Sequence, residues 1–214
     1  MESFSTTASE AMRTIIGACQ TPVVVLLLVA AVFVLGCIGS LVVEYFTEHR
    51  RFKVFLPRLV DELEAAGRNS REAIEGSGLL LRQKQYLIEL TLHPELDDIM
   101  RESLAEGLEY GEQRRYDIIT KITDLASRIA PMLGLLGTLI PLGPGILALS
   151  TGDTATLSAS LLVAFDTTAL GLIIAGFALI ISAIRKRWYK DYMISFAAAM
   201  ECVLLMQSNP GGRR

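Results

Sequence analysis

Three long apolar stretches constrain this chain more than any other feature of its sequence. They run from Pro22 to Val43, from about Ala126 to Leu149 and from about Ser158 to Ile184. A helix needs about 20 predominantly apolar residues to cross the hydrocarbon of a bilayer, and each stretch reaches that length. The sequence therefore predicts an all-α membrane protein with three transmembrane helices.

Basic residues beside the apolar stretches predict the orientation in the membrane. They are Arg50, Arg51 and Lys53 after the first stretch, Arg114, Arg115, Lys121 and Arg128 before the second, and Arg185, Lys186, Arg187 and Lys190 after the third. Cytoplasmic flanks of membrane helices are enriched in Lys and Arg, so we expect these ends to be cytoplasmic. The predicted topology is N-out and C-in, with the first stretch retained as an anchor.

The same reasoning divides the chain into seven segments. They are an external N-terminal segment (1–21), the first transmembrane helix (22–43), a cytoplasmic helical insertion (44–125), the second transmembrane helix (126–149), an external loop (150–157), the third transmembrane helix (158–184) and a cytoplasmic helical tail (185–214). Helix breaks are predicted at Gly67–Ser70 and at His93-Pro94, with Asn69 or Ser70 as a helix cap. Apolar residues recur at helical spacing in the insertion and the tail. We therefore expect the second and third helices to extend into a cytoplasmic helical bundle, whose simplest role is to stabilise an oligomer.

Small and weakly polar residues form one stripe on each of the last two spans. The stripes consist of Ser127, Pro131, Gly134, Thr138, Pro141 and Gly145 on the second span, and Ser160, Ala164, Thr168, Gly171, Ala175, Ala178 and Ser182 on the third. Intervals of three and four residues place each set on one helix face. Such a face favours either close helix packing or a water-lined pore, and both interpretations are open at this point.

Two threonines of these stripes lie at a similar depth in the membrane. Thr138 and Thr168 are each roughly 15–18 Å below the outer end of their span, near the bilayer midplane. A hydroxyl can donate and accept a hydrogen bond but does not store charge at neutral pH. We therefore expect them to help pass a proton, with the titrating group supplied from elsewhere.

Asp166 is the only ionisable residue of the third apolar stretch. An ionisable side chain inside a span is costly and usually functional. It lies about 160° from Thr168 around the helix, so it does not belong to the small stripe. Two interpretations are open, an additional proton or sodium station reached from outside and a hydrogen-bonded strut to a neighbouring helix.

Several classes of function have no support in the sequence. The formal net charge is −3, and no Lys/Arg-rich run outside the membrane flanks indicates nucleic-acid binding. Cys19, Cys37 and Cys202 include no CxxC pair, and His49 and His93 are isolated, so neither a disulfide framework nor a metal site is predicted. The chain has no Walker A, dinucleotide-binding, HExxH or GxSxG pattern. We expect no cofactor and no enzymatic chemistry.

Two segments of the last two spans resemble a known family. Ala130-Pro131-Met132-Leu133-Gly134-Leu135-Leu136-Gly137-Thr138 is similar to A-P-x-L-G-L-L-G-T, and Ala164-Phe165-Asp166-Thr167-Thr168-Ala169-Leu170-Gly171-Leu172 is similar to A-L-x-x-T-A-x-G-L, of the MotA/TolQ/ExbB proton-channel family. The detailed resemblance covers about residues 126–186, and the three-span topology looks like the ExbB/TolQ branch rather than the four-span flagellar branch. The sequence departs from the family after Thr138, where Pro141 and Pro144 predict a kink. It also departs at Gly176-Phe177, where the family has Ile-Pro.

The resemblance implies a specific assembly. It is a homopentamer in the cytoplasmic (inner) membrane, whose second and third helices line a pore around the single transmembrane helices of two copies of an ExbD/TolR-like partner with an intramembrane aspartate. Thr138 and Thr168 match the pore-lining threonines of the family, whereas Pro131, Gly134, Gly137 and Gly171 match its structural positions. Asp166 and Thr167, beside Thr168, complete the set of candidate residues for the proton path.

The implied function is that of a proton-conducting stator subunit of an ion-driven motor. Such a subunit couples the membrane ion gradient to mechanical work, for example in protein transport, through its single-span partner. The alternative is a non-conducting structural membrane scaffold, which predicts that replacing both threonines with valine leaves function unchanged.

Overall fold

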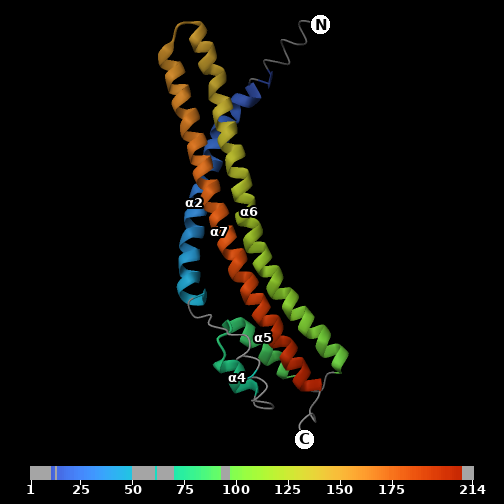
Figure 1. Ribbon diagram of the computed structural model, residues 1–214. Coiled ribbons are helices and arrows are strands. Elements are labelled where there is room, and N and C mark those ends of the chain that lie inside the picture. Colours follow the sequence, from blue (N-terminus) through green and yellow to red (C-terminus); the bar gives the residue numbers. More distant parts are fainter. Residues whose placement is uncertain (1–10, 13, 50–60, 62–69, 93–96, 209–214) are drawn as a thin grey trace. The chain divides into compact units, whose positions relative to one another are not determined.

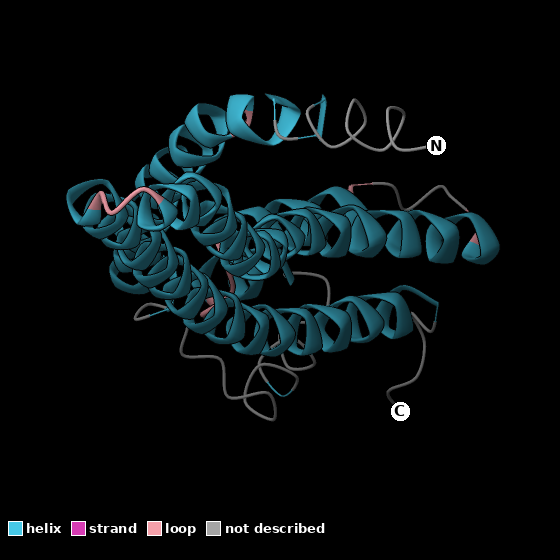
Figure 2. Cartoon of the chain, turned by 90° about the horizontal axis from the view of Figure 1, so that it is seen from above, coloured by secondary structure: helices cyan, strands magenta, loops and turns pink. Residues whose placement is uncertain are grey.

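The computed structural model describes residues 11–12, 14–49, 61, 70–92 and 97–208. Within these ranges the chain is helical apart from short turns and contains no strand (Figure 2). The helices are α2 (Gln20–Glu44), η1 (Tyr45–His49), α4 (Ser70–Gly76), α5 (Leu81–Thr91), α6 (Asp98–Ser150) and α7 (Thr154–Ser208). The predicted all-α fold class is thereby confirmed.

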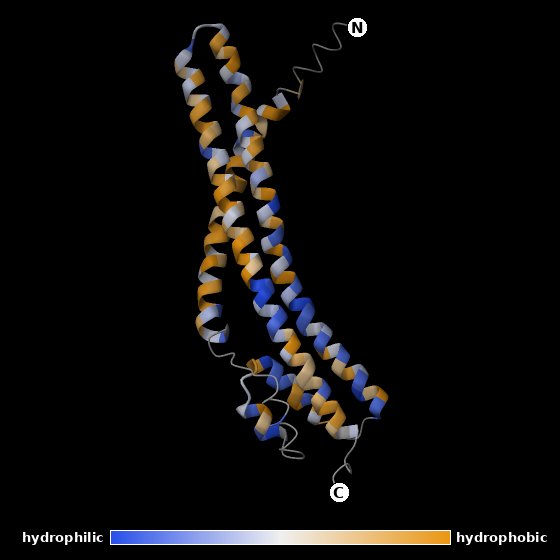
Figure 3. Cartoon of the chain, in the orientation of Figure 1, coloured by the Kyte–Doolittle hydropathy of each residue, from blue (hydrophilic) through white to orange (hydrophobic). Residues whose placement is uncertain are grey.

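Three of the described helical segments are long and apolar enough to cross a membrane. Each contains one of the predicted spans, and the segments belong to α2, α6 and α7. Figure 3 shows the hydrophobic residues along α2 and along the parts of α6 and α7 nearest their shared turn, whereas hydrophilic residues gather farther along both helices. The orientation of the spans in the membrane stays a prediction.

Helices α6 and α7 each continue well beyond the predicted spans. Helix α6 runs without interruption from Asp98 to Ser150, through Pro131, Pro141 and Pro144, and α7 runs from Thr154 to Ser208. This confirms that the second and third spans continue into the insertion and the tail. Of the predicted breaks, His93-Pro94 and residues 67–69 lie outside the described residues, and Ser70 is the first residue of α4.

The turn between α6 and α7 is shorter than the predicted loop 150–157. Gly152 has a φ of 78°, a left-handed conformation that favours glycine. Asp153 then accepts hydrogen bonds from the backbone N–H of Thr156 at 3.0 Å and from its hydroxyl at 2.5 Å. These bonds lower the pKa of Asp153 and cap the first turn of α7, so the helix begins at Thr154.

The chain consists of two compact units, which we describe separately. The membrane unit comprises residues 1–40 and 121–183, and the extramembrane unit comprises residues 41–120 and 184–214. In the membrane unit, α6 and α7 are antiparallel and joined by the short turn (Figure 1). Helix α2 buries Val23, Leu27 and Val34, and the chain thus supplies three helices to this unit.

The extramembrane unit has its own hydrophobic core. Its buried members are Ile74, Leu79, Leu87, Leu90, Ala105, Phe196, Ala199, Met200 and Val203. A second cluster joins Leu80 to three tyrosines, and the rings of Tyr116 and Tyr189 stack with their centroids 4.2 Å apart. Segments far apart in the sequence therefore fold together into a helical bundle, as the periodicity of the insertion and the tail predicts.

Candidate functional site

Glycines allow the backbones of α6 and α7 to touch in the membrane unit. A Cβ atom added to Gly171 would lie 2.7 Å from the carbonyl oxygen of Ala130 and 3.0 Å from the Cα of Gly134. A Cβ atom at Gly134 would lie 3.2 Å from the carbonyl oxygen of Thr167. At these positions the small stripes therefore form the packing interface between the two helices of one chain.

Thr167 lies inside this interface. A Cβ atom added to Gly137 would be only 2.7 Å from the Cβ of Thr167 and 2.8 Å from its Oγ1. The side chain of Thr167 is 7% exposed, and its hydroxyl is within hydrogen-bond distance of the carbonyl oxygens of Val163 and Ala164. It thus fills the space that Gly137 leaves open, and its participation in a proton path stays a prediction.

Thr138 and Thr168 lie at the rim of the same interface and are half-buried. The Thr138 hydroxyl donates to the carbonyl oxygen of Leu135 at 2.6 Å, and the Thr168 hydroxyl donates to that of Ala164 at 3.1 Å. The Cα of Thr168 would be 3.4 Å from a Cβ at Gly134, which lies one helical turn from Thr138. Because each hydroxyl proton is used within its own helix, the oxygens remain available as acceptors at the rim.

Helices α6 and α7 also contact each other toward both ends of the spans. Near the turn, a Cβ added to Gly145 would lie 3.1 Å from the Cβ of Ser160. At the opposite end of the membrane unit, the hydroxyl of Ser182 donates a short hydrogen bond to the carboxylate of Asp124. Contacts between α6 and α7 of one chain are therefore present near the turn, at the glycines and at the opposite end of the membrane unit.

Asp166 is exposed on the surface of α7 and makes no hydrogen bond within the described residues. Its neighbours on that face, Leu162, Ala169 and Ile173, are exposed and apolar. A carboxyl group in contact with lipid is costly, so in the membrane this face requires water or another chain. Within the described residues, Asp166 therefore forms no strut to a neighbouring helix of the same chain.

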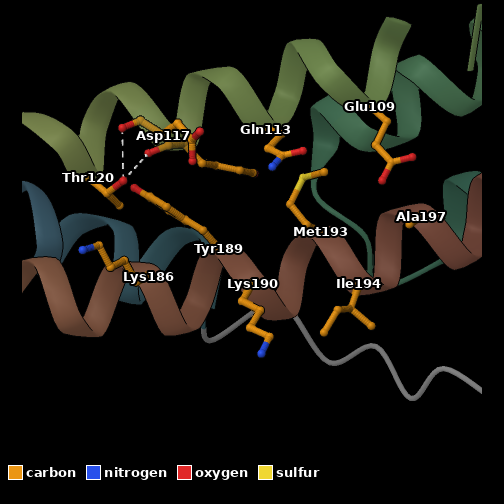
Figure 4. A pocket seen from close by; sticks show the side chains of 11 residues that line it. Glu109, Gln113, Asp117, Thr120, Lys186, Tyr189, Lys190, Met193, Ile194 and Ala197 are labelled. Atoms are coloured by element: carbon orange, nitrogen blue, oxygen red, sulfur yellow. Dashed lines mark hydrogen bonds between the residues drawn. The ribbon is translucent and has the colours of Figure 1, made fainter. Parts of the chain in front are cut away.

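A shallow groove lies between α6 and α7 in the extramembrane unit (Figure 4). It encloses about 390 Å³. Glu109 and Asp117 line it from α6, and Lys186 and Lys190 line it from α7. Charges of both signs are therefore present on its walls, and the groove does not select a ligand of one charge. No group of three His, Cys, Asp or Glu residues in the described part of the chain is arranged to hold a metal ion.

Comparison with known proteins identifies the family. The model of the MotA/TolQ/ExbB proton channel family matches residues 78–197. The chain belongs to this family. The match covers more than half of the 214 residues and includes α5, α6 and most of α7, so both glycine-containing segments fall inside it. No curated protein matches the chain.

Family membership agrees with the prediction from the two short motifs, although it does not distinguish the ExbB/TolQ branch from the others. Three helices of spanning length together with this family indicate a multi-pass membrane protein of a proton-channel type. Within the motifs, Gly134 and Gly171 form the backbone contact of α6 and α7, Gly137 leaves room for the side chain of Thr167, and Thr138 and Thr168 lie at the rim of this contact. The sequence did not predict the contact of Asp124 with Ser182. The only feature that could have suggested it is the position of Asp124 one helical turn before Ser127.

Proposed function

We propose that this protein is the proton-conducting stator subunit of an ExbB/TolQ-like motor, which couples the membrane ion gradient to mechanical work. The family match supports the proposal, because it includes Thr138, Thr168 and the close contact of α6 with α7 beside them. Rigid backbone contact holds Thr138 and Thr168 in place, while their oxygens remain able to accept a hydrogen bond.

The proposed assembly is a homopentamer around two copies of a single-span ExbD/TolR-like partner. At the level of Thr138 and Thr168 the rim of the α6–α7 pair offers hydroxyl groups. The titrating group of the proposed path therefore comes from a partner helix that contains an aspartate. A hydroxyl beside that carboxylate stabilises its ionised form and helps to transfer the proton. Asp166, on a different face of α7, then contacts a neighbouring subunit or serves as an additional ion station.

The proposed location is the cytoplasmic (inner) membrane, with the N-terminus outside and the extramembrane unit in the cytoplasm. One elementary charge that crosses the membrane releases about 2.3 kcal/mol per 100 mV, so a few protons supply enough energy to break a protein contact. The work is mechanical, and the protein needs no enzymatic chemistry of its own.

Proton flux through the intact complex tests this proposal. The complex is purified from its native membrane through a tag on this chain and reconstituted in vesicles that contain a pH-sensitive dye. Under an imposed membrane potential, the wild type acidifies or alkalinises the vesicle interior. Because a hydrogen bond to a charged group is worth about 1.5–3 kcal/mol, we expect Thr138→Val with Thr168→Val to reduce the flux about 10- to 100-fold.

Thr151→Val is the matched control for this experiment. Like Thr138, Thr151 donates its hydroxyl to the carbonyl oxygen three residues earlier, at 2.9 Å, but it lies in the α6–α7 turn. Its variant should conduct like the wild type. The structural scaffold alternative predicts no flux in the wild type and no effect of either set of variants, and that result would reject the motor proposal.

A further inference from the structure

Asp124 of α6 and Ser182 of α7 form a polar contact within the membrane unit. The hydroxyl of Ser182 donates a short hydrogen bond to the carboxylate of Asp124. Ser182 is 2% exposed, whereas Asp124 is half-buried. The contact therefore joins a hydroxyl group enclosed between the two helices to an acidic residue that is partly open to its surroundings.

The contact lies at a matched distance from the two threonines of the proposed proton path. On α6, Asp124 precedes Thr138 by fourteen residues. On α7, Ser182 follows Thr168 by fourteen residues. At 1.5 Å per residue, each member of the contact is about 21 Å from its threonine, toward the end of the spans that the basic flanks predict to be cytoplasmic.

Asp124 also lies on the side of α6 that presents Thr138. Fourteen residues at about 100° each bring the two side chains to within about 40° of one another around the helix axis. Both residues are half-buried, and both lie beside the contact of α6 with α7. The α6–α7 pair therefore has two polar levels on the same side, one with hydroxyl groups and one with a carboxyl group.

Asp124 is the first carboxyl group of α6 or α7 on the way from the threonines to the predicted cytoplasmic end. Residues 125–137 of α6 and 169–190 of α7 contain no Asp or Glu. Asp166 lies on the other side of Thr168, toward the turn between the two helices. A proton that leaves the level of the threonines in the cytoplasmic direction thus meets Asp124 before any other carboxyl group of these helices.

We propose that Asp124 is the proton-release residue of the proposed path and that Ser182 is its positioning residue. This inference rests on the proposed function and adds a residue to it. The partner's carboxylic acid gives its proton to water near the threonines, and water carries the proton over the intervening distance. The carboxylate of Asp124 accepts it by forming an O–H bond, then returns it to cytoplasmic water and becomes a carboxylate again.

Ser182 holds the carboxylate in place for this step. A hydrogen bond from a neutral hydroxyl to an ionised carboxylate is stronger than one between two neutral groups, and it fixes the direction in which the carboxylate points. Because Ser182 is enclosed, its hydroxyl group holds Asp124 from the side of the helix contact. The proton then arrives and leaves on the side of Asp124 that is partly exposed.

A purely structural role for the contact would use different atoms. A hydrogen-bonded link between α6 and α7 needs only an acceptor at position 124 and the hydroxyl group of Ser182, whereas proton release needs a carboxyl group. Asp124→Asn separates the two roles. Its amide oxygen can still accept the hydrogen bond from Ser182, but the amide does not take up and release a proton at neutral pH.

Proton flux through the purified native complex in dye-loaded vesicles tests the assignment. A positioned proton-transfer group typically contributes about 10²–10⁴-fold to a rate. We therefore expect Asp124→Asn to reduce the flux per assembled complex by about 100-fold or more. Asp124→Glu returns a carboxyl group to the same position and should recover most of the wild-type flux.

Two further variants complete the experiment. Ser182→Ala removes the link between the helices but keeps the carboxyl group, so it should lose less flux than Asp124→Asn. Glu106→Gln neutralises an exposed acidic residue of the same helix and should conduct like the wild type. The mass of each purified complex shows that the variants are compared in the same state of assembly.

The outcomes distinguish this inference from the proposed function. Wild-type flux that Asp124→Asn leaves unchanged would overturn the inference and leave the motor proposal intact. Equal losses in Asp124→Asn, Asp124→Glu and Ser182→Ala would also overturn it, because they would indicate a structural link alone. A wild type that conducts no protons would reject the proposed function and, with it, the need for a release residue.

Discussion

Replacement of Gly171 by alanine tests the backbone contact on which the α6–α7 pair depends. The new Cβ atom would lie 2.7 Å from the carbonyl oxygen of Ala130, whereas an ordinary van der Waals contact begins at 3.4 Å. The helices must therefore separate by about 0.7 Å at this point, and overpacking of this kind costs about 1–3 kcal/mol. The substitution also gains about 1 kcal/mol of helix propensity, which obscures the steric cost if it is measured alone.

Gly143→Ala and Gly176→Ala remove this ambiguity. Both glycines lie within α6 or α7, and a Cβ atom at either position would meet no atom within 4 Å. These controls gain the same helix propensity without the clash. The difference in free energy of unfolding between Gly171→Ala and the controls should therefore equal the steric cost alone.

The assay is reversible unfolding of the full-length protein in mixed micelles, followed by circular dichroism. We expect Gly171→Ala to be less stable than both controls by about 1–3 kcal/mol. Equal stability of the three variants would show that α6 and α7 do not touch at Gly171. It would then contradict the claim that this contact positions Thr138 and Thr168.

Two further predictions concern the extramembrane unit. Phe196 is completely buried in its hydrophobic core, so Phe196→Ala should cost about 3–5 kcal/mol in chemical unfolding, whereas Leu205→Ala, at an exposed position of α7, should cost little. The raised pKa of Glu48 means that the folded protein binds more protons than the unfolded chain above pH 4.5. The free energy of unfolding should therefore fall as the pH rises from 4.5 through the pKa of folded Glu48. Thermal unfolding of Glu48→Gln at several pH values should show a weaker dependence on pH. An unchanged dependence would contradict a raised pKa at Glu48.

The fold was predictable because its main features are local properties of the sequence. Uninterrupted apolar length identifies the three spans, and the absence of breaks after residue 97 extends α6 and α7 beyond the membrane. The length of the turn was overestimated, because it depends on the hydrogen bonds of Asp153 to Thr156 and on the left-handed conformation of Gly152. Side-chain capping of this kind is hard to recognise from residue types alone.

The candidate site was predictable only in part. Helical periodicity places Thr138, Thr168 and the glycines on one face of each span, but it does not say which helix that face contacts. The structure shows that the glycines pack against the other span of the same chain and that Thr167 is enclosed between them. Asp166 was recognised because it is the one charge in an apolar stretch.

The burial of Glu112 gave no signal in the sequence. Glu112 lies in a segment rich in charged residues, where solvent exposure is the ordinary expectation. Its burial results from packing of α6 against segments that are distant along the chain, including α5 and α7. Only the folded arrangement therefore shows that this carboxyl group is enclosed.

A structure of the complete assembly in a lipid nanodisc tests the central claim of this account most directly. We expect Thr138 and Thr168 of every copy to line one axial cavity that encloses partner helices, with an acidic side chain of the partner at the level of these threonines. An assembly in which both threonines contact acyl chains, or in which no axial cavity exists, would contradict the assignment of this protein as a conducting subunit.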